Sequence, residues 1–275
     1  MKTQLYCYLE DREKRIVPST EGFERWLDPD RTAIACIDMH RGHVGPDKEL
    51  TLPAPRARAK IPAHNLFHAH ARALGIPVIQ VQHWQRHGGI DDARSKQWNR
   101  GGNWRHLYEL YLPPNALMLE HSWEGTKWLD LMIDVGPDDY FVRTKKRLSA
   151  FYPTDFDFLL RQLDVKNLVI TGTYTDACVL STALDAANRD YRVIVPRDVV
   201  AGYSEEAEHA ALQIISLHAG LVVDAPALLA EWYARKDTKL PQALAGITDI
   251  CQAAGAGVTA RAAQVQAPGA AAANG

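Results

Sequence analysis

The sequence has few cysteines, no large excess of positive or negative charge, and no long apolar run. Each of these absences excludes a class of protein. Four cysteines occur in 275 residues, with neither a zinc-binding spacing nor the dense pattern of a disulfide framework: Cys7, Cys36, Cys178 and Cys251. Thiols that are few and scattered are typical of a reducing compartment. We therefore expect a cytoplasmic protein.

Charge and hydropathy argue against two kinds of partner. The 31 basic and 33 acidic residues nearly cancel, and the net charge of -2 leaves no basic excess to bind nucleic acid. The N-terminus, MKTQLYCYLEDREKR, lacks the apolar stretch of a signal peptide, and no apolar run reaches the roughly 18 residues of a membrane span. We expect neither a nucleic-acid nor a membrane partner.

Short apolar segments alternate with helical patterns from residue 32 onward. The strand patterns lie at residues 32–38, 77–83, 140–144, 167–172, 191–198 and 221–224. The helical patterns lie at residues 61–75, 154–164, 175–190, 204–220 and 225–236. This alternation predicts βαβ units and an α/β fold with three layers, α/β/α, around a mostly parallel, six-stranded, Rossmann-like sheet.

The two ends of the chain do not follow this pattern. Residues 1–30 are interpreted as an arm with one candidate strand at residues 4–10, which packs either on the domain or on a neighbouring subunit. Residues 31–236 form the predicted domain. Residues 237–275 are rich in alanine and glycine, cannot build a core, and are expected to be a disordered tail.

A long segment at residues 84–139 separates the second and third predicted strands. It contains five of the seven tryptophans: Trp84, Trp98, Trp104, Trp123 and Trp128. Long loops in compact domains are commonly lids or binding loops. The same aromatic residues are equally suited to a second small core or to an oligomer interface, and the sequence leaves both interpretations open.

Chemically useful side chains follow three of the predicted strands. The first strand ends at Asp38, the third runs into Lys145, and the fourth leads to Cys178 at the start of a helix. The carboxyl ends of parallel strands meet at one edge of a sheet, where sites form. A helix start and a nearby lysine favour a thiolate, and Asp38 is placed to accept and return a proton.

Each of these residues also has an ordinary structural explanation. A cysteine in an apolar helix is often inert packing, an aspartate at a strand end often caps a loop, and lysines such as those in KKR usually face water. The joint position of all three at strand ends favours the functional interpretation.

Three blocks of sequence resemble the isochorismatase-like cysteine hydrolases, a family that includes nicotinamidases, N-carbamoylsarcosine amidohydrolase and ureidoacrylate or biuret amidohydrolases. TAIACIDMH resembles the family's first strand with its catalytic aspartate. RTKKRLSAFYPTDFDFLLRQL is similar to K-x-x-x-S-A-F-x-x-T-D-L-x-x-x-L. NLVITGTYTDACVLSTALDAANRD is similar to G-x-x-T-[ND]-x-C-V-x-x-T-x-x-D-A. The resemblance runs from about residue 31 to about residue 225 and implies an isochorismatase-like fold.

The resemblance implies a role for each matching residue. Asp38, Lys145 and Cys178 correspond to the catalytic aspartate, lysine and nucleophilic cysteine. The peptide bond between Thr173 and Tyr174 corresponds to the family's cis peptide, and the N–H groups of Tyr174 and Cys178 correspond to its oxyanion hole. True isochorismatases lack the cysteine, so its presence favours amide or carbamoyl chemistry.

Five residues near these positions are candidates for the substrate pocket: His40, His43, His83, Trp84 and Phe151. Nicotinamidases place an aspartate and two histidines around a metal after the second strand. This chain has VQHWQRHGG there, with His83 and His87 as weak metal candidates and no matching aspartate. We expect no metal and no other cofactor.

The resulting prediction is a cysteine-dependent amidohydrolase that cleaves a C–N bond of a small amide, carbamoyl or urea-type substrate through a thioester. The alternatives are a metal-dependent deamidase of the nicotinamidase type and a non-catalytic binding protein on the same fold. The resemblance also implies a homo-oligomer, a dimer or a tetramer. The sequence does not define the substrate, and it leaves open the roles of the arm and the tail.

Overall fold

The computed structural model describes residues 5–8, 14–17, 22–47, 50, 53–91 and 120–239. Within these ranges nine strands form one sheet in the order β2-β1-β9-β7-β6-β3-β4-β5, with β8 beside β6. The parallel strands are β3 (Thr32–Ile37), β4 (Val78–His83), β5 (Tyr140–Lys145), β6 (Asn167–Thr173), β7 (Arg192–Pro196) and β9 (Gly220–Val223). The predicted α/β fold class is confirmed, and the six expected strands are these six.

The arm extends the domain's own sheet. Its expected strand corresponds to β1 (Leu5–Tyr8), which pairs antiparallel with β9. A second arm strand, β2 (Lys14–Val17), pairs antiparallel with β1 and was not predicted. A two-residue strand, β8 (Val200–Ala201), is also additional and lies beside the end of β6.

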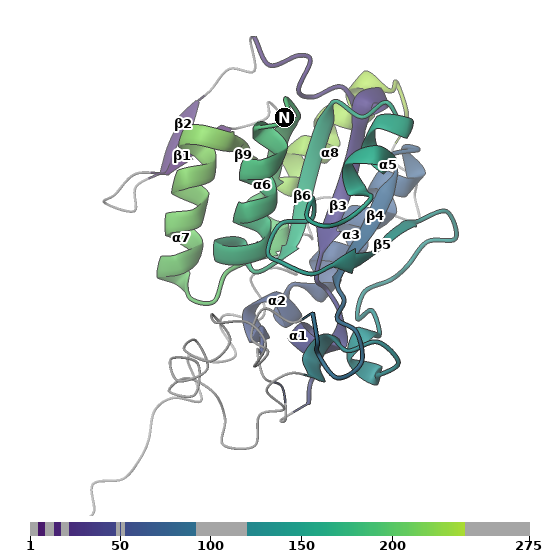
Figure 1. Ribbon diagram of the computed structural model, residues 1–275. Coiled ribbons are helices and arrows are strands. Elements are labelled where there is room, and N and C mark those ends of the chain that lie inside the picture. Colours follow the sequence, from purple (N-terminus) through teal and green to yellow (C-terminus); the bar gives the residue numbers. More distant parts are fainter. Residues whose placement is uncertain are drawn as a thin grey trace, which may run out of the picture.

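Helices cover both faces of the sheet (Figure 1). One face carries α5 (Phe156–Gln162), α6 (Leu180–Ala187) and α7 (Glu205–Ile214). The other face carries α3 (Ile61–Ala73) and α8 (Ala225–Arg235). This is the three-layer arrangement that short apolar strands alternating with helices require, because both faces of a parallel sheet need a cover.

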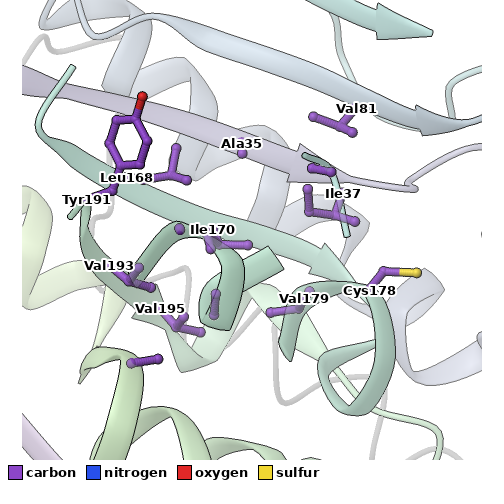
Figure 2. Close-up of a cluster of buried hydrophobic side chains, with 14 of the residues drawn as sticks. Ala35, Ile37, Val81, Leu168, Ile170, Cys178, Val179, Tyr191, Val193 and Val195 are labelled. Carbon is purple, nitrogen blue, oxygen red and sulfur yellow. The ribbon is translucent and has the colours of Figure 1, made fainter. Parts of the chain in front are cut away.

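Alternating side chains of β3 divide the core between the two layers. Ala35 and Ile37 belong to the cluster under α5 and α6, which Figure 2 shows, whereas Ile34 belongs to the cluster under α3 and α8. In the second cluster the rings of Phe67 and Trp232 lie 6.0 Å apart and join the two helices. All six residues of β3 are buried, which fixes the strand at the centre of the molecule.

Short helical elements fill the connections. They are η1 (Pro29–Arg31), α1 (Arg41–Val44), α2 (Pro55–Ala59), η2 (Glu120–Ser122), η3 (Lys127–Leu129) and η5 (Arg197–Val199). Two of the predicted helices contain a π-helical turn: η4 (Thr175–Val179) precedes α6, and η6 (Ile215–Ala219) follows α7. Turns of this kind are rare and are frequent at functional sites.

Two expectations fall outside the described residues. Trp98 and Trp104 of the tryptophan-rich segment are among them, as is the predicted tail from residue 240 onward. None of the helices in the described part of the chain has both the length and the apolar character needed to cross a membrane.

The face of α3 that meets the sheet contains polar residues that a hydrophobic pattern does not predict. His64 and His68 are fully buried, and their rings lie 5.8 Å apart. The Nδ1 atom of His64 lies 2.9 Å from the Lys60 carbonyl oxygen, and the Nε2 atom of His68 lies 3.3 Å from the Thr171 hydroxyl. Burial lowers the pKa of His64 to about 4 and holds the pKa of His68 well below its ordinary value.

These buried imidazoles should make stability depend on pH. Below pH 6.5 or so the unfolded chain binds protons on both histidines, whereas the folded chain keeps His64 neutral until about pH 4. Their contribution is therefore fully present above about pH 6.5 and is lost as the pH falls toward 4, at up to about 1.4 kcal/mol per pH unit for each histidine.

We predict that His64→Gln flattens this pH dependence by up to the share of one histidine. The measurement is the free energy of unfolding by urea at several values between about pH 5 and pH 8. His218→Gln, which replaces an exposed histidine, is the control and should keep the wild-type slope. An unchanged slope in the His64 variant would show that this imidazole is not a source of the acid sensitivity.

Candidate active site

Asp38 directly follows β3 and is fully buried. Its Oδ1 atom accepts a hydrogen bond of 2.7 Å from the His83 backbone N–H, and its Oδ2 atom lies 2.6 Å from the Lys145 Nζ atom. Its backbone has a φ of 56°, which is sparsely populated for residues other than glycine and concentrates at functional sites. The carboxylate is thus held from both sides.

Lys145 is the last residue of β5 and is also fully buried. In the pairing of β4 with β5, Val142 lies opposite Val81 and Lys145 lies opposite His83. Three steps along β5 thus match two steps along β4, so β5 contains one extra residue, a β-bulge. Simple alternation would place Thr144 on the same face as Val142. The bulge gives that inward position to Lys145, and accordingly Val142 and Lys145 are buried whereas Thr144 is exposed.

Cys178 lies in η4, just beyond the end of β6, and only 8% of its surface is exposed. Its Sγ atom lies 3.3 Å from the Lys145 Nζ atom. In Figure 2 it occupies one end of the apolar cluster, with its sulfur directed away from Val179. The peptide bond between Thr173 and Tyr174, which precedes this turn, is cis.

A glycine makes the approach of β6 to β3 possible next to this turn. Gly172 has a φ of 105°, and a Cβ atom on it would lie 2.1 Å from the Ile37 carbonyl oxygen. Any larger residue would push apart the two strand ends that lead to Asp38 and Cys178. The structure therefore brings the aspartate, the lysine and the cysteine together in one buried group.

Burial and charge act against each other in this group. Burial opposes ionisation of Asp38, but the Lys145 ammonium and, to a smaller extent, neighbouring histidines bring the pKa of the carboxyl group below its usual range. Burial also acts to lower the pKa of Lys145, yet the charges of Asp38 and Cys178 leave it raised. These shifts favour a carboxylate and an ammonium ion.

The thiol behaves differently from the sequence-based expectation. Burial raises the pKa of Cys178 to about 12, and the lowering effect of the Lys145 charge does not overcome it. The expected activation of the thiolate by the lysine and the helix start is thus outweighed, because the group is enclosed and already contains the Asp38 carboxylate. At neutral pH the resting group holds a carboxylate, an ammonium ion and a thiol.

The predicted pocket residues separate into two sets. The ring of Phe151 packs in the hydrophobic core, with centroids 4.9 Å from Phe156 and 6.1 Å from Tyr191. His40 is fully buried, and its Nδ1 atom lies 2.9 Å from the Trp128 carbonyl oxygen. Phe151 and His40 thus have clear structural roles.

Trp84 lies at the surface, half-buried, between two cavities. Their volumes are about 490 and 500 Å³, and Trp84 and Arg143 line both. Their described linings do not include Asp38, Lys145 or Cys178. Trp128, from the same tryptophan-rich segment, is instead buried. Of these two tryptophans, one therefore lines the cavities and the other belongs to the packed interior.

The histidines gather in a way that the sequence only partly indicated. His43, His83 and His121 each offer a ring nitrogen, and these nitrogens lie within 4.8 Å of one another, a donor set suited to a transition metal. His87 is not in this group, since its exposed ring packs against Trp123. His121 was not identified from the sequence, because it is far from the other two along the chain and belongs to no motif.

The model of one protein family, described as the isochorismatase domain, matches residues 32–227. This chain belongs to the isochorismatase family. The family resemblance found in the sequence is therefore confirmed.

Two curated relatives and one solved structure illustrate the likeness. The isochorismatase family protein PncA of Bacillus subtilis is 34% identical over 112 residues, which cover 38% of this chain and 61% of that protein. The ureidoacrylate amidohydrolase RutB of Methylobacterium radiotolerans is 33% identical over 220 residues, 73% of this chain and 79% of that one. A cysteine hydrolase from Pseudomonas syringae pv. phaseolicola has the same fold, with a TM-score of 0.60 at 23% identity over 75% of this chain and 94% of its own.

We predict that Lys145→Met destabilises the fold by about 3–5 kcal/mol, because it leaves the Asp38 carboxylate buried without its counter-charge. The double variant Asp38→Asn/Lys145→Met should recover part of that loss. The measurement is urea unfolding of the wild type, both single variants and the double variant at neutral pH. Strictly additive changes would mean that the two groups do not stabilise each other.

Proposed function

We propose that this chain is a cysteine-dependent amidohydrolase that cleaves a C–N bond of a small amide, carbamoyl or urea-type substrate. The observation that carries the proposal is the position of the Lys145 Nζ atom, 2.6 Å from an Asp38 oxygen and 3.3 Å from the Cys178 sulfur. The group contains a nucleophile, a proton acceptor and a fixed positive charge. The relative named ureidoacrylate amidohydrolase supports the same class of reaction.

The first step in this proposal is a proton transfer inside the buried group. Asp38 accepts the Cys178 proton as the sulfur attacks the carbonyl carbon, so a C–S bond forms while the carbonyl oxygen takes up negative charge. The transfer leaves the net charge of the group unchanged. Ionising Cys178 beside a charged Asp38 would instead add a second negative charge to an enclosed site, in keeping with the raised pKa of the thiol.

The oxyanion then needs donors, and we assign this role to the backbone N–H groups of Tyr174 and Cys178. Preorganised donors of this kind contribute about 3 kcal/mol each to the stability of the transition state. As the C–N bond breaks, Asp38 returns its proton to the leaving nitrogen, and a thioester on Cys178 remains. Ammonia or an amine is released.

Hydrolysis of the thioester uses the same groups in reverse order. Asp38 takes a proton from a water molecule, the resulting hydroxide attacks the thioester carbon, and the C–S bond breaks. The proton on Asp38 then returns to the sulfur, and an acid or a carbamate leaves. Lys145 remains an ammonium ion throughout, which compensates the negative charge as it moves between Asp38 and Cys178.

A non-catalytic binding protein is the less favoured alternative. A scaffold gains nothing from a fully buried lysine between a carboxylate and a thiol, since replacing a buried ion pair with apolar residues is often neutral or stabilising. We also propose that the chain forms a homo-oligomer, as the family resemblance implies. Light scattering of the purified protein would test this.

We predict that Cys178→Ala abolishes hydrolysis, lowering kcat/KM by about three orders of magnitude or more, because the reaction loses its nucleophile. Release of ammonia or amine is measured over a panel of primary amides, carbamoyl amines, ureido acids and aryl ureas. Cys36→Ala is the matched control, since Cys36 is the other buried thiol in the described residues and should be dispensable. Full turnover by the Cys178 variant would exclude the mechanism.

We also predict that a covalent intermediate accumulates on Cys178 during turnover. Rapid acid quenching of the wild type, followed by intact-protein and peptide mass spectrometry, should find the acyl or carbamoyl mass on the peptide that contains Cys178. Asp38→Asn should show no adduct, because its amide cannot accept the thiol proton. An adduct on any other residue would show that Cys178 is not the nucleophile.

A further inference from the structure

Two cavities lie at β5, the last strand in the order of the sheet (Figure 1). Their volumes of about 490 and 500 Å³ are each sufficient for a small organic molecule. Trp84, just after β4, and Arg143, in β5, line both cavities. These two side chains are therefore the shared wall of one hollowed region.

The alternation of side chains along β5 turns Arg143 away from the buried group. Val142 and Lys145 are buried, and Val142 belongs to the core under α5 and α6. Phe141 and Arg143, on either side of Val142, are exposed and project from the opposite face of the strand. The region around Arg143 is thus separate from the site in which Lys145 meets Asp38.

Two aromatic rings hold the Arg143 guanidinium in place. Its central carbon lies 4.3 Å from the centroid of the Phe141 ring and 5.8 Å from that of the Trp84 ring. Guanidinium groups stack on aromatic faces in this way, and the stacking leaves the N–H groups at the edge of the plane available. The charge is therefore positioned by the rings rather than by an acid.

Arg143 has neither an ion pair nor a hydrogen bond to any residue within the described ranges. A second arginine shows the contrast. Arg189 lies 4.7 Å from the centroid of the Phe151 ring, but it also pairs with the Asp185 carboxylate at 3.4 Å. Arg143 keeps its planar set of donors, which matches the two oxygens of a carboxylate, without such a partner.

The first cavity has an excess of positive charge. Four cationic side chains and two carboxylates are among its described lining residues: Arg86, Arg143, Lys146, Arg147, Asp91 and Glu124. The Asp91 carboxylate already pairs with Arg86 at 3.1 Å and with Lys146 at 3.0 Å. An anion that enters this cavity therefore meets two more positive charges than negative ones.

The second cavity is mainly apolar. Its described lining includes five apolar or aromatic side chains: Trp84, Leu129, Leu131, Val135 and Phe141. Val135 and Phe141 expose 44% and 37% of their surface, so they are open to a ligand. Asp130 is the one carboxylate among its described lining residues. A flat apolar ring suits this wall, whereas a second negative charge does not.

We infer that Trp84 and Arg143 form a binding site for a flat aromatic carboxylate, distinct from the buried group of Asp38, Lys145 and Cys178. The ring of the ligand packs on Trp84 and the apolar wall, and its carboxylate accepts hydrogen bonds from the Arg143 guanidinium. An inorganic anion would leave the apolar wall uncovered, and a neutral ring would leave the guanidinium without a counter-charge. The inference does not rest on the proposed hydrolysis.

The test is isothermal titration calorimetry of the full chain at neutral pH with three probes. 2-Naphthoate has both the ring and the carboxylate, 2-naphthol has the ring alone, and acetate has the carboxylate alone. The wild type should bind one 2-naphthoate per chain, with a Kd of about 1 mM or tighter, as expected for a ligand of this size. Both 2-naphthol and acetate should bind at least about tenfold more weakly.

Two variants locate the bound probe. Arg143→Ala should weaken 2-naphthoate about 10- to 100-fold and leave 2-naphthol nearly unchanged, because it removes a charged hydrogen-bond donor. Arg143→Lys should restore only part of the affinity, since an ammonium ion cannot make the paired hydrogen bonds of a guanidinium. Trp84→Leu should weaken both 2-naphthoate and 2-naphthol about tenfold, because it removes the stacking surface.

Arg189→Ala is the matched control, because it removes an exposed arginine that also stacks on a ring but lines neither cavity, and it should bind like the wild type. Circular dichroism and urea unfolding of each variant separate a loss of binding from a loss of fold. The inference is overturned if the wild type does not bind 2-naphthoate. It is equally overturned if Arg143→Ala and Trp84→Leu bind it as tightly as the wild type, since the probe then occupies another place.

A second copy of the chain is the competing occupant of this face. If the wild type fails to bind 2-naphthoate and Arg143→Ala lowers the mass found by light scattering, the region is an interface between copies and the inference is wrong.

This site and the proposed hydrolysis can fail separately. Cys178→Ala should lose turnover and still bind 2-naphthoate with unchanged affinity, because the thiol is not among the described residues of either cavity. Binding without hydrolysis of any substrate would remove the proposed function and leave the carboxylate site standing. Hydrolysis by a protein that does not bind 2-naphthoate would do the reverse.

Discussion

The ion pair between Asp38 and Lys145 is the constraint on which the rest of the site depends. Both side chains are fully excluded from water, and each buried ion costs several kcal/mol unless its partner is in place. The pair therefore requires that the end of β3 and the end of β5 stay in register across β4. It also explains the bulge in β5, without which Thr144 would face inward where Lys145 now lies.

Much of this arrangement was predictable because its members stand at recognisable places in the sequence. Asp38 and Cys178 follow buried apolar strands, and parallel strands deliver their ends to one edge of a sheet. The direction of Lys145 was not predictable from alternation, since a bulge leaves no simple mark in a sequence. His121 was out of reach for another reason: only the folded chain brings η2 against α1.

The charge state of the thiol shows where sequence reasoning reaches its limit. A lysine and a helix start near Cys178 both favour a thiolate, and from the sequence these were the visible influences. The opposing influence is enclosure, together with a carboxylate already charged in the same group. Enclosure results from the packing of the layers. Its effect on the pKa of the Cys178 thiol therefore becomes clear only when α6, β6 and β5 are assembled. In the proposed mechanism the thiol proton accordingly moves within the group.

The same reasoning explains why neutral imidazoles suit the position beside the buried group. A further carboxylate beside Asp38 would add negative charge to a site that holds only one ammonium ion. It would make ionisation of Cys178 still less favourable. The neighbouring imidazoles add no such charge and instead help to lower the pKa of the Asp38 carboxyl group, and the His83 backbone N–H supports the carboxylate directly. The residue that ends β4 thus stabilises the buried ion pair through its main chain.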